Sequence, residues 1–189
     1  HNEQRAGAPV ADVNFRSKQQ GWKKFEMALS FGNKMVYNKT LDKDEYLRAF
    51  LQNVTLRPSC YECNFKTLGR ASDLTLADFW GVDTVMPELA DDKGVSLVLV
   101  HSDKGKNLLD SISDKIVWQQ ADLKKAIAFN SAAVKPVEKH SARDLFFKDL
   151  DNMPFDALVN KYCRIRFKTK VRRMVRSAGS KAKRLIAKI

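Results

Sequence analysis

The sequence of 189 residues is 44% hydrophobic and carries a formal net charge of +12. This length allows a domain with a hydrophobic core, and this composition argues against an intrinsically disordered chain. No apolar run approaches the roughly 20 residues of a membrane-spanning helix. Three cysteines, an odd number, argue against a disulfide framework, so we expect a globular protein of the reducing cytoplasm.

Three segments are expected along the chain. Residues 1–14 are predicted to be a loose lead-in, and the polar start at His1 without Met indicates either a tag remnant or a position inside a longer protein. Residues 15–163 are expected to form the domain, and residues 164–189 a basic tail.

An antiparallel hairpin is predicted shortly after the lead-in. From Trp22 onward, apolar side chains recur at every second position, which is the period of a half-buried strand. Gly32 and Asn33 form a turn signal, and residues 35–37 supply the returning strand. The apolar face of the first strand consists of Phe25, Met27, Leu29 and Phe31.

A helix over residues 42–51 should follow the hairpin. Either Thr40 or Asp42 can serve as its N-cap, because both side chains accept hydrogen bonds from the first turn of a helix. The apolar stripe of this helix is expected to consist of Tyr46, Leu47, Phe50 and Leu51.

Two strands are predicted after the loop that contains two of the cysteines. In the first strand, Leu74 and Leu76 point to one side, and Asp73 and Thr75 point to the other. The second strand spans residues 94–100 and is nearly continuously apolar, so we expect it to be buried on both faces.

The remainder of the chain is expected to be mainly helical. The first helix is predicted at 103–114, with Asp103 as its cap and with Leu108, Leu109 and Ile112 facing inward. Three more helices are predicted, one at 122–129, one that begins at Ser141, and one that runs from Pro154 towards Cys163. A short strand is expected at 116–118. Because strands and helices mix without regular alternation, the predicted fold class is α+β, or an incomplete α/β domain, with a mixed sheet and flanking helices.

Cys60 and Cys63 form a C-x-x-C pair, which brings two thiols to one point and suits a metal site or a redox disulfide. A 4Fe–4S cluster needs about four thiolates, and no second C-x-x-C pair or H-x-x-x-H motif completes a zinc site. Either this chain therefore holds half of a metal site, or the pair is vestigial. Cys163 is expected to pack as a small hydrophobic residue.

Several separated segments, in order and at matching spacing, resemble the C-terminal domain of the coenzyme F420 hydrogenase/dehydrogenase beta-subunit family. The resemblance covers roughly residues 13–150, and within the family the chain is most similar to the bacterial branch. The main matching segments are FRSK at 15–18, GWK at 21–23, LRPSCYEC at 56–63, DLTLADFWG at 73–81 and KGVSLVLV at 93–100 with Lys104 and Gly105. Asn130, Pro136 and residues 143–147 follow in the same order.

The resemblance implies an iron–sulfur flavoprotein that passes electrons between a 4Fe–4S cluster, FAD and a further redox partner. Cys60 and Cys63 would supply part of the cluster's ligands, and an N-terminal half of the parent protein would supply the others. Similar bacterial proteins are linked to surface polysaccharide biosynthesis, and the chain alone is expected to be inactive. The polar residues expected at the redox centre are Asp73, Thr75, Asp78 and Arg57.

One residue departs from the family's pattern. The position before Asp78 is usually glycine in the family and is Ala77 here, which puts a close backbone approach to a flavin in doubt. This departure and the incomplete cysteine set favour a rival interpretation. In it the chain is a non-catalytic interaction module, and its cysteine pair is a relic.

The basic tail holds 11 of the 34 Lys and Arg residues and no acidic residue. Its apolar residues recur at steps of three and four, which predicts a basic amphipathic helix over residues 164–189. Such a helix suits an anionic membrane surface, a partner protein or the missing half of the protein. Nucleic acid is the least favoured partner, because no recognition motif accompanies the charge. We therefore expect a cytoplasmic protein whose tail binds at the inner membrane or in a complex.

Overall fold

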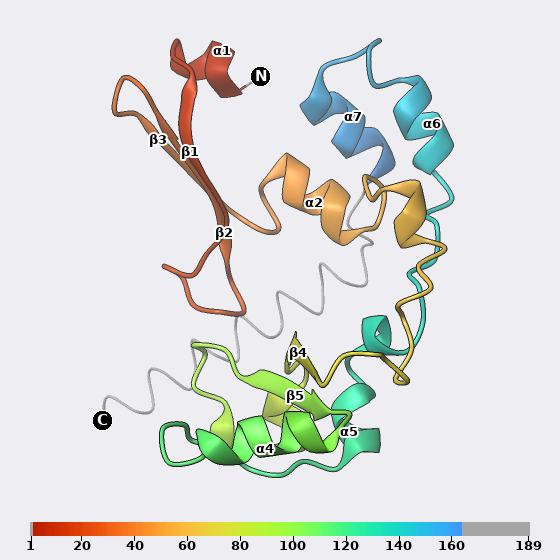
Figure 1. The fold of residues 1–189 in the computed structure, drawn as a ribbon. Helices are drawn as coiled ribbons and strands as arrows, with labels where there is room; N and C mark the ends of the chain where they lie inside the picture. The colour runs from red at the N-terminus through yellow and green to blue at the C-terminus, as the bar shows by residue number, and fades with distance from the viewer. Residues whose placement is uncertain (1, 164–189) are drawn as a thin grey trace, which may run out of the picture. The chain divides into compact units, whose positions relative to one another are not determined.

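Two compact units make up the chain, residues 1–140 and residues 141–189 (Figure 1). The computed structural model describes residues 2–163, so the amphipathic helix predicted at 164–189 lies outside the described residues. Two small sheets and several short helices confirm the predicted α+β class. The strands form two separate antiparallel sheets in place of the single mixed sheet expected. The predicted domain limits at 15 and 163 stay a prediction.

The first sheet contains β1 (Val10–Ser17), β2 (Glu26–Phe31) and β3 (Val36–Thr40), in that order. Together with α1 (Asn2–Ala6), β1 occupies much of the stretch expected to be a loose lead-in, so that expectation is wrong. Ala11, Val13 and Phe15 of β1 alternate with polar residues, but all three are exposed, so this alternation does not mark a buried face.

The predicted hairpin is confirmed by the antiparallel pairing of β2 with β3, which runs from Glu26 opposite Thr40 to Ser30 opposite Val36. All four residues of the predicted apolar face are buried and form one cluster with Leu47 of α2 (Glu45–Leu51). Alternation thus predicted the buried face of β2 because one side of this sheet packs on the protein and the other does not.

The N-cap of α2 is Asp44, and the prediction of Thr40 or Asp42 is wrong. The Asp44 carboxylate accepts a hydrogen bond from the backbone N–H of Leu47 at 2.7 Å. The predicted apolar stripe is correct only for Leu47, because the remaining three members are exposed. These are Tyr46, Phe50 and Leu51.

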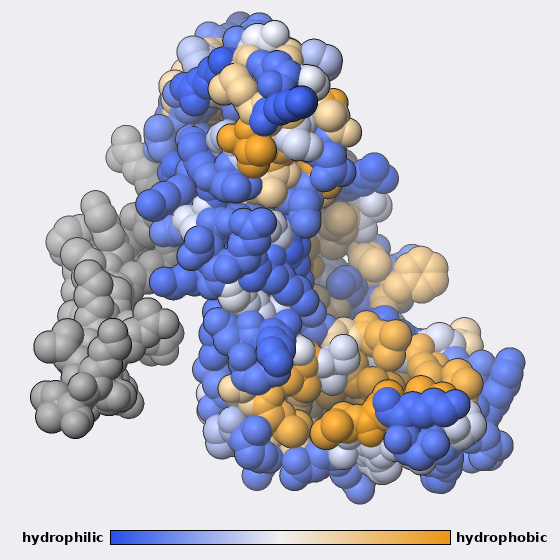
Figure 2. Space-filling model, turned by 90° about the vertical axis from the view of Figure 1, so that its left-hand side faces the viewer, coloured by the Kyte–Doolittle hydropathy of each residue, from blue (hydrophilic) through white to orange (hydrophobic). Residues whose placement is uncertain are grey.

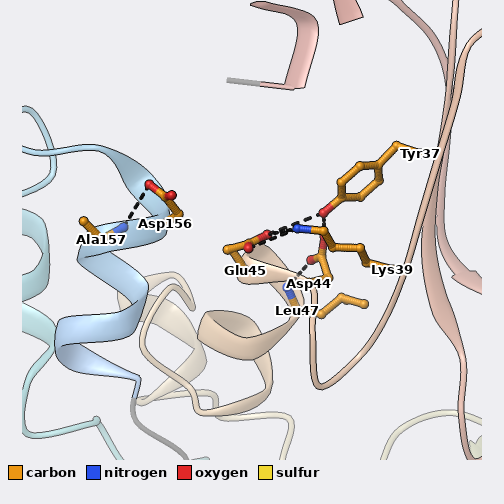
Figure 3. A network of polar contacts seen from close by, with 7 residues as sticks. All are labelled: Tyr37, Lys39, Asp44, Glu45, Leu47, Asp156 and Ala157. Carbon is orange, nitrogen blue, oxygen red and sulfur yellow. Dashed lines mark hydrogen bonds and ion pairs between the residues drawn. The ribbon is translucent and has the colours of Figure 1, made fainter. Parts of the chain in front are cut away.

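A polar network joins the start of α2 to β3 (Figure 3). The Tyr37 hydroxyl donates to Asp44 Oδ2 at 2.6 Å, and Lys39 Nζ lies 3.1 Å from Glu45 Oε1. Burial and then the hydrogen bond and negative charge of Asp44 raise the pKa of Tyr37 far above its usual range. One carboxylate therefore caps the helix and also accepts the hydroxyl that links it to the sheet.

The second sheet consists of β4 (Leu74–Asp78) and β5 (Ser96–Val100), with Leu74 opposite Val100 and Asp78 opposite Ser96. One face of this sheet contributes to a core together with α3 (Val82–Val85) and α5 (Leu123–Ile127). The buried members of that core are Phe79, Val82, Met86, Leu97 and Ala126.

The opposite face of the second sheet is open, which contradicts the prediction that residues 94–100 are buried on both faces. Leu76 is 73% exposed and Val100 42%, whereas Leu97 on the packed face is 6% exposed. Figure 2 shows apolar side chains gathered over the lower part of the view, the level at which Figure 1 draws β4, β5 and α4 (Asp103–Ser111). A continuous apolar run does not reveal how many layers will cover it.

The cap of α4 is Ser102, not Asp103, because the Ser102 hydroxyl accepts a hydrogen bond from the backbone N–H of Gly105 at 3.1 Å. Leu108 and Ile112, which were expected to face inward, are exposed. The helix also ends at Ser111, before the predicted limit.

The strand predicted at 116–118 does not form, and Val117 is 98% exposed. The helix predicted at 122–129 is confirmed as α5, and Asp122 is its N-cap. Three short helical turns complete the first unit. They are η1 (Pro58–Cys60), η2 (Pro87–Leu89) and η3 (Ser131–Ala133).

The second unit contains α6 (Arg143–Lys148) and α7 (Phe155–Tyr162), both of which were predicted. Pro154 lies at the N-cap of α7. Cys163 is fully buried, in agreement with a packing role. Across residues 2–163, no helix combines the length and the hydropathy that crossing a bilayer requires.

We expect the free energy of unfolding to decrease as the pH rises above about 10, where tyrosine in an unfolded chain ionises. Folded Tyr37 keeps its proton in this range because its pKa is raised, so the unfolded state binds fewer protons than the folded state. Urea unfolding from about pH 8 to pH 11 measures the effect. Tyr37→Phe should remove part of the alkaline loss, and an unchanged pH dependence would contradict this.

Replacing Asp44 should destabilise the protein through the cap of α2. Asp44→Ala removes the acceptor for Leu47 and for the Tyr37 hydroxyl, so we expect a loss of about 2 kcal/mol in the free energy of unfolding. Asp44→Asn is the matched control, because its amide oxygen can still cap the helix. Equal losses in the two variants would argue that the charge, and not the cap, is what matters.

Candidate functional site

The loop that carries Cys60 and Cys63 is held by contacts close in sequence. The Tyr61 hydroxyl donates to the backbone carbonyl of Asn53 at 2.7 Å, which ties the loop to the residues just after α2. Arg57 precedes η1 with the extended backbone of a residue before proline, and its carbonyl accepts from Cys60 N at 2.9 Å. A short helical turn therefore fixes the backbone at Cys60, and Cys63 follows three residues later in the same loop.

Both cysteines line one open cavity of about 630 Å³. Both are free and half-buried, so their thiols are accessible from this cavity. Its charged lining residues are one acid, Glu62, and one base, Lys66. The apolar part of the lining consists of Phe50, Leu51, Leu56, Phe65 and Val137.

The cysteine pair has no third metal donor beside it within residues 2–163, where no group of three or more His, Cys, Asp or Glu residues could hold a metal ion. Cys163 is buried in the second unit. The pair therefore fits half of the four-thiolate set of a 4Fe–4S cluster. The part of the chain that the structure describes shows no flavin site.

Asp73, just before β4, is bound by residues that follow β5. Ser102 Oγ donates to Asp73 Oδ1 at 2.6 Å, and Lys104 Nζ lies 3.6 Å from Oδ2. The hydrogen bond from Ser102 and the charge of Lys104 hold the pKa of Asp73 below its usual range. Gly105 packs on the backbone of Asp73, where any side chain would clash. These contacts make Asp73 an anchor for the first turn of α4.

Thr75 pairs with His101, a residue for which no functional role was predicted. Thr75 Oγ1 and His101 Nε2 are 2.9 Å apart. The sheet register places Thr75 opposite Leu99, so His101 follows two residues later on the same face. This contact could have been predicted only from the register of β4 and β5.

Asp78, at the far end of β4, forms an ion pair with Arg16 of β1. Arg16 Nη1 lies 2.6 Å from Asp78 Oδ2, and the guanidinium carbon is 5.0–5.7 Å from three aromatic ring centroids. These rings belong to Trp22, Phe25 and Trp80. The Nε and Nη2 atoms of Arg16 are buried without a hydrogen-bond partner, so the rings replace water around this cation.

Further contacts around Trp22 join the same two sheets. The Trp22 ring lies 4.6 Å from the Trp80 ring, and its backbone N–H donates to the carbonyl of Asp92 at 2.8 Å. Gly94 has φ of 100°, and a Cβ there would lie 2.6 Å from Trp22 Cδ1. We call this set the sheet junction: Arg16, Trp22, Phe25, Asp78, Trp80, Asp92 and Gly94. It unites residues from four of the segments on which the resemblance rests, 15–18, 21–23, 73–81 and 93–100.

The structure separates the polar residues expected at the redox centre. Asp73 and Thr75 lie at one end of β4 and Asp78 at the other end, on the opposite side of the strand. Arg57 is exposed and precedes η1. Among the described residues that line the cysteine cavity, none of these four occurs. A single polar face beside the cysteines is therefore wrong, and the roles of these residues towards a cofactor stay predictions.

The comparisons with known proteins give one match. A family model matches residues 2–126, and it describes the C terminus of the beta subunit of coenzyme F420 hydrogenase/dehydrogenase. This range includes both sheets, the sheet junction and the cysteine loop. Neither the comparison with curated proteins nor the comparison with solved structures found a match.

The importance of the aromatic contacts can be tested by comparing two ion pairs, Arg16–Asp78 in the sheet junction and the exposed pair Lys23–Asp83. We expect Arg16→Lys to lower the free energy of unfolding by about 1–2 kcal/mol, because an ammonium is more strongly hydrated than the guanidinium and loses more on contact with the three rings. Lys23→Ala removes the exposed Lys23–Asp83 pair and should cost less than about 0.5 kcal/mol. Urea denaturation measures both losses. A larger loss for Lys23→Ala would contradict the importance of the aromatic contacts.

Proposed function

Because the chain belongs to the family defined by the C-terminal region of the coenzyme F420 hydrogenase/dehydrogenase beta subunit, we propose that Cys60 and Cys63 are thiolate ligands of a 4Fe–4S cluster. The observation that carries the proposal is that both cysteines line one cavity, on a loop that the Tyr61–Asn53 hydrogen bond ties to the residues after α2. Two cysteines three residues apart are a common pair in cluster-binding loops. Free, half-buried thiols suit such ligation better than sealed ones.

In this proposal the parent protein is an iron–sulfur flavoprotein oxidoreductase. A bound cluster supplies one-electron transfer, and FAD and a separate redox partner, both implied by the family, would exchange electrons with it. The contribution of this chain is to hold two ligands and to limit water at the cluster through the apolar lining of the cavity. The other ligands and the flavin contacts would come from outside the described residues.

Four polar residues have a supporting role in this proposal. Asp73 and Thr75 are held by Ser102 and His101, and Asp78 is held by Arg16, so each has a fixed orientation. Because none of these three residues lines the cysteine cavity, the contacts proposed for them are with the flavin and not with the cluster. Arg57, at the start of the cysteine turn, would place a positive charge near the anionic cluster.

A non-catalytic interaction module is the second candidate function. It is favoured by the open apolar face of the second sheet, where Leu76 is 73% exposed. In this alternative the basic segment at 164–189 adds contact with an anionic membrane or a protein complex. A link to surface polysaccharide synthesis at the inner membrane would apply to either candidate and rests on the resemblance alone.

Anaerobic reconstitution with iron, sulfide and excess dithiothreitol tests the ligand proposal, because the small thiol can complete the ligand set. We expect a broad visible absorption band and bound iron in the wild type. Cys60→Ser/Cys63→Ser should reduce bound iron to background, because no other pair of thiols is accessible. Cys163→Ala is the matched control and should bind iron like the wild type. Equal iron in the wild type and the double variant would exclude this cysteine pair as the ligand set.

A further inference from the structure

We propose that Cys60 and Cys63 form a reversible disulfide with each other, so that the oxidation state of the loop decides whether the pair can bind a metal. The inference rests on the proposed function and adds the regulation of the same two cysteines. Both thiols are free, and both cysteines are half-buried and line one open cavity of about 630 Å³. Accessible cysteines separated by two residues are the arrangement that disulfide oxidoreductases use.

The backbone between the two cysteines has the curvature that a bridge needs. A disulfide joins Cα atoms about 4.4–6.8 Å apart, whereas three steps of an extended chain span about 10 Å. The chain turns at Tyr61, whose backbone N–H donates to the Pro58 carbonyl at 3.0 Å, and it bends again at Glu62. The segment that the disulfide would close is therefore curved, not extended, while the thiols are free.

Tyr61 also anchors this curved segment. It lies between the two cysteines in the sequence, and its hydroxyl donates to the backbone carbonyl of Asn53 at 2.7 Å. An anchored loop keeps the two thiols in a small volume, which raises the effective concentration of one thiol at the other. A bridge within the loop is therefore favoured over two separate adducts with small thiols.

The metal-free pair is open to oxidation. Within residues 2–163, no group of three or more His, Cys, Asp or Glu residues could hold a metal ion and so protect the two thiols. Cys163, by contrast, is fully buried, and a small disulfide in the solvent does not reach it. Oxidation through the cavity therefore acts on Cys60 and Cys63.

The oxidant in this proposal is a small disulfide of the glutathione class. The thiolate of one cysteine attacks a sulfur of the small disulfide, which breaks its S–S bond, forms a mixed disulfide and releases one small thiol. The second cysteine then attacks the protein sulfur of the mixed disulfide and releases the other small thiol. The protein loses two electrons and two protons, and the two released thiols carry them away.

The charged residues of the cavity fit this class of oxidant. Glutathione carries carboxylate groups and an ammonium group and is negative overall at neutral pH. Lys66 and Glu62 supply one charge of each sign at the cavity that the two cysteines line. Lys66 attracts the carboxylates of the oxidant, and this attraction raises the rate at which the oxidant and a thiol meet.

The bridge and metal ligation exclude each other. A cysteine binds a metal as a thiolate, so two sulfurs that are joined to each other cannot serve as ligands. A small thiol reduces the bridge by the reverse of the exchange reaction and makes the pair available again. The loop therefore admits a cluster only under reducing conditions.

Equilibration of the metal-free 189-residue chain with defined ratios of glutathione and glutathione disulfide tests the bridge. An acid quench, alkylation in denaturant and mass spectrometry then identify the free thiols. We expect the thiols of Cys60 and Cys63 to disappear together, with the loss of one hydrogen from each sulfur. Cys163 should stay free, and Cys163→Ala should behave like the wild type. Cys60→Ser and Cys63→Ser should each stop at a mixed disulfide with glutathione.

A charge reversal tests the class of the oxidant. Lys66→Glu should lower the rate of oxidation by glutathione disulfide about threefold relative to the rate with neutral hydroxyethyl disulfide. The neutral reagent is the matched control, because it reports any change in the reactivity of the thiols themselves. An unchanged ratio of the two rates would overturn a glutathione-type disulfide as the oxidant.

The outcomes separate this inference from the ligand proposal. The oxidised chain should bind no iron during anaerobic reconstitution without reductant, and dithiothreitol should restore cysteine-dependent iron. Cysteine-dependent iron in a chain that shows only free thiols or separate glutathione adducts at every ratio overturns the bridge and leaves Cys60 and Cys63 as ligands. A bridge in a chain that binds no such iron even after reduction overturns the ligand proposal and leaves the disulfide. Equal iron in the oxidised and reduced chains overturns the control of ligation by oxidation.

Discussion

The packing of Arg16 against three aromatic rings is the constraint on which the first unit depends. A guanidinium that has lost part of its water needs an opposite charge nearby, and Asp78 provides it at 2.6 Å. Arg16 belongs to the first sheet and Asp78 to the second, so neither sheet can shift without breaking this contact. The chain over residues 52–73 leaves α2 and enters β4. The sheet junction therefore fixes one end of the connection that contains the cysteine pair.

Local patterns predicted the elements whose signals are local. The apolar alternation of β2 and the helix expected from residue 122 were both correct, because each depends on residues within one turn or one strand. The cap of α2 was misplaced because three candidates, Thr40, Asp42 and Asp44, follow one another at intervals of two. Only Asp44 lies where its carboxylate reaches the N–H of Leu47. The burial of β5 was overestimated, because the elements that cover one face of its sheet, and the lack of a cover on the other face, depend on parts of the chain distant from β5.

The candidate site shows the same division between local and distant information. The spacing of Cys60 and Cys63 predicted that the two thiols share one place, and both line one cavity. The pairing of Arg16 with Asp78 joins residues 62 positions apart, and no short-range pattern encodes it. An acidic residue read as a cofactor contact therefore has a protein partner that only the three-dimensional structure reveals. Sequence spacing predicts ligands that lie within one turn, but it does not predict the ion-pair partner of a residue when that partner belongs to another sheet.

The stacking of Trp22 on Trp80 gives the protein a built-in optical reporter. Indole rings 4.6 Å apart couple electronically, so their circular dichroism and emission depend on mutual orientation. The chain has three tryptophans, and the remaining one, Trp118, is 53% exposed and lies outside the stacked pair. Because each ring of the pair is carried by a different side of the sheet junction, the signal follows the alignment of the two sheets. The circular dichroism and emission of the unlabelled protein thus report whether the two sheets next to the cysteine loop keep their alignment.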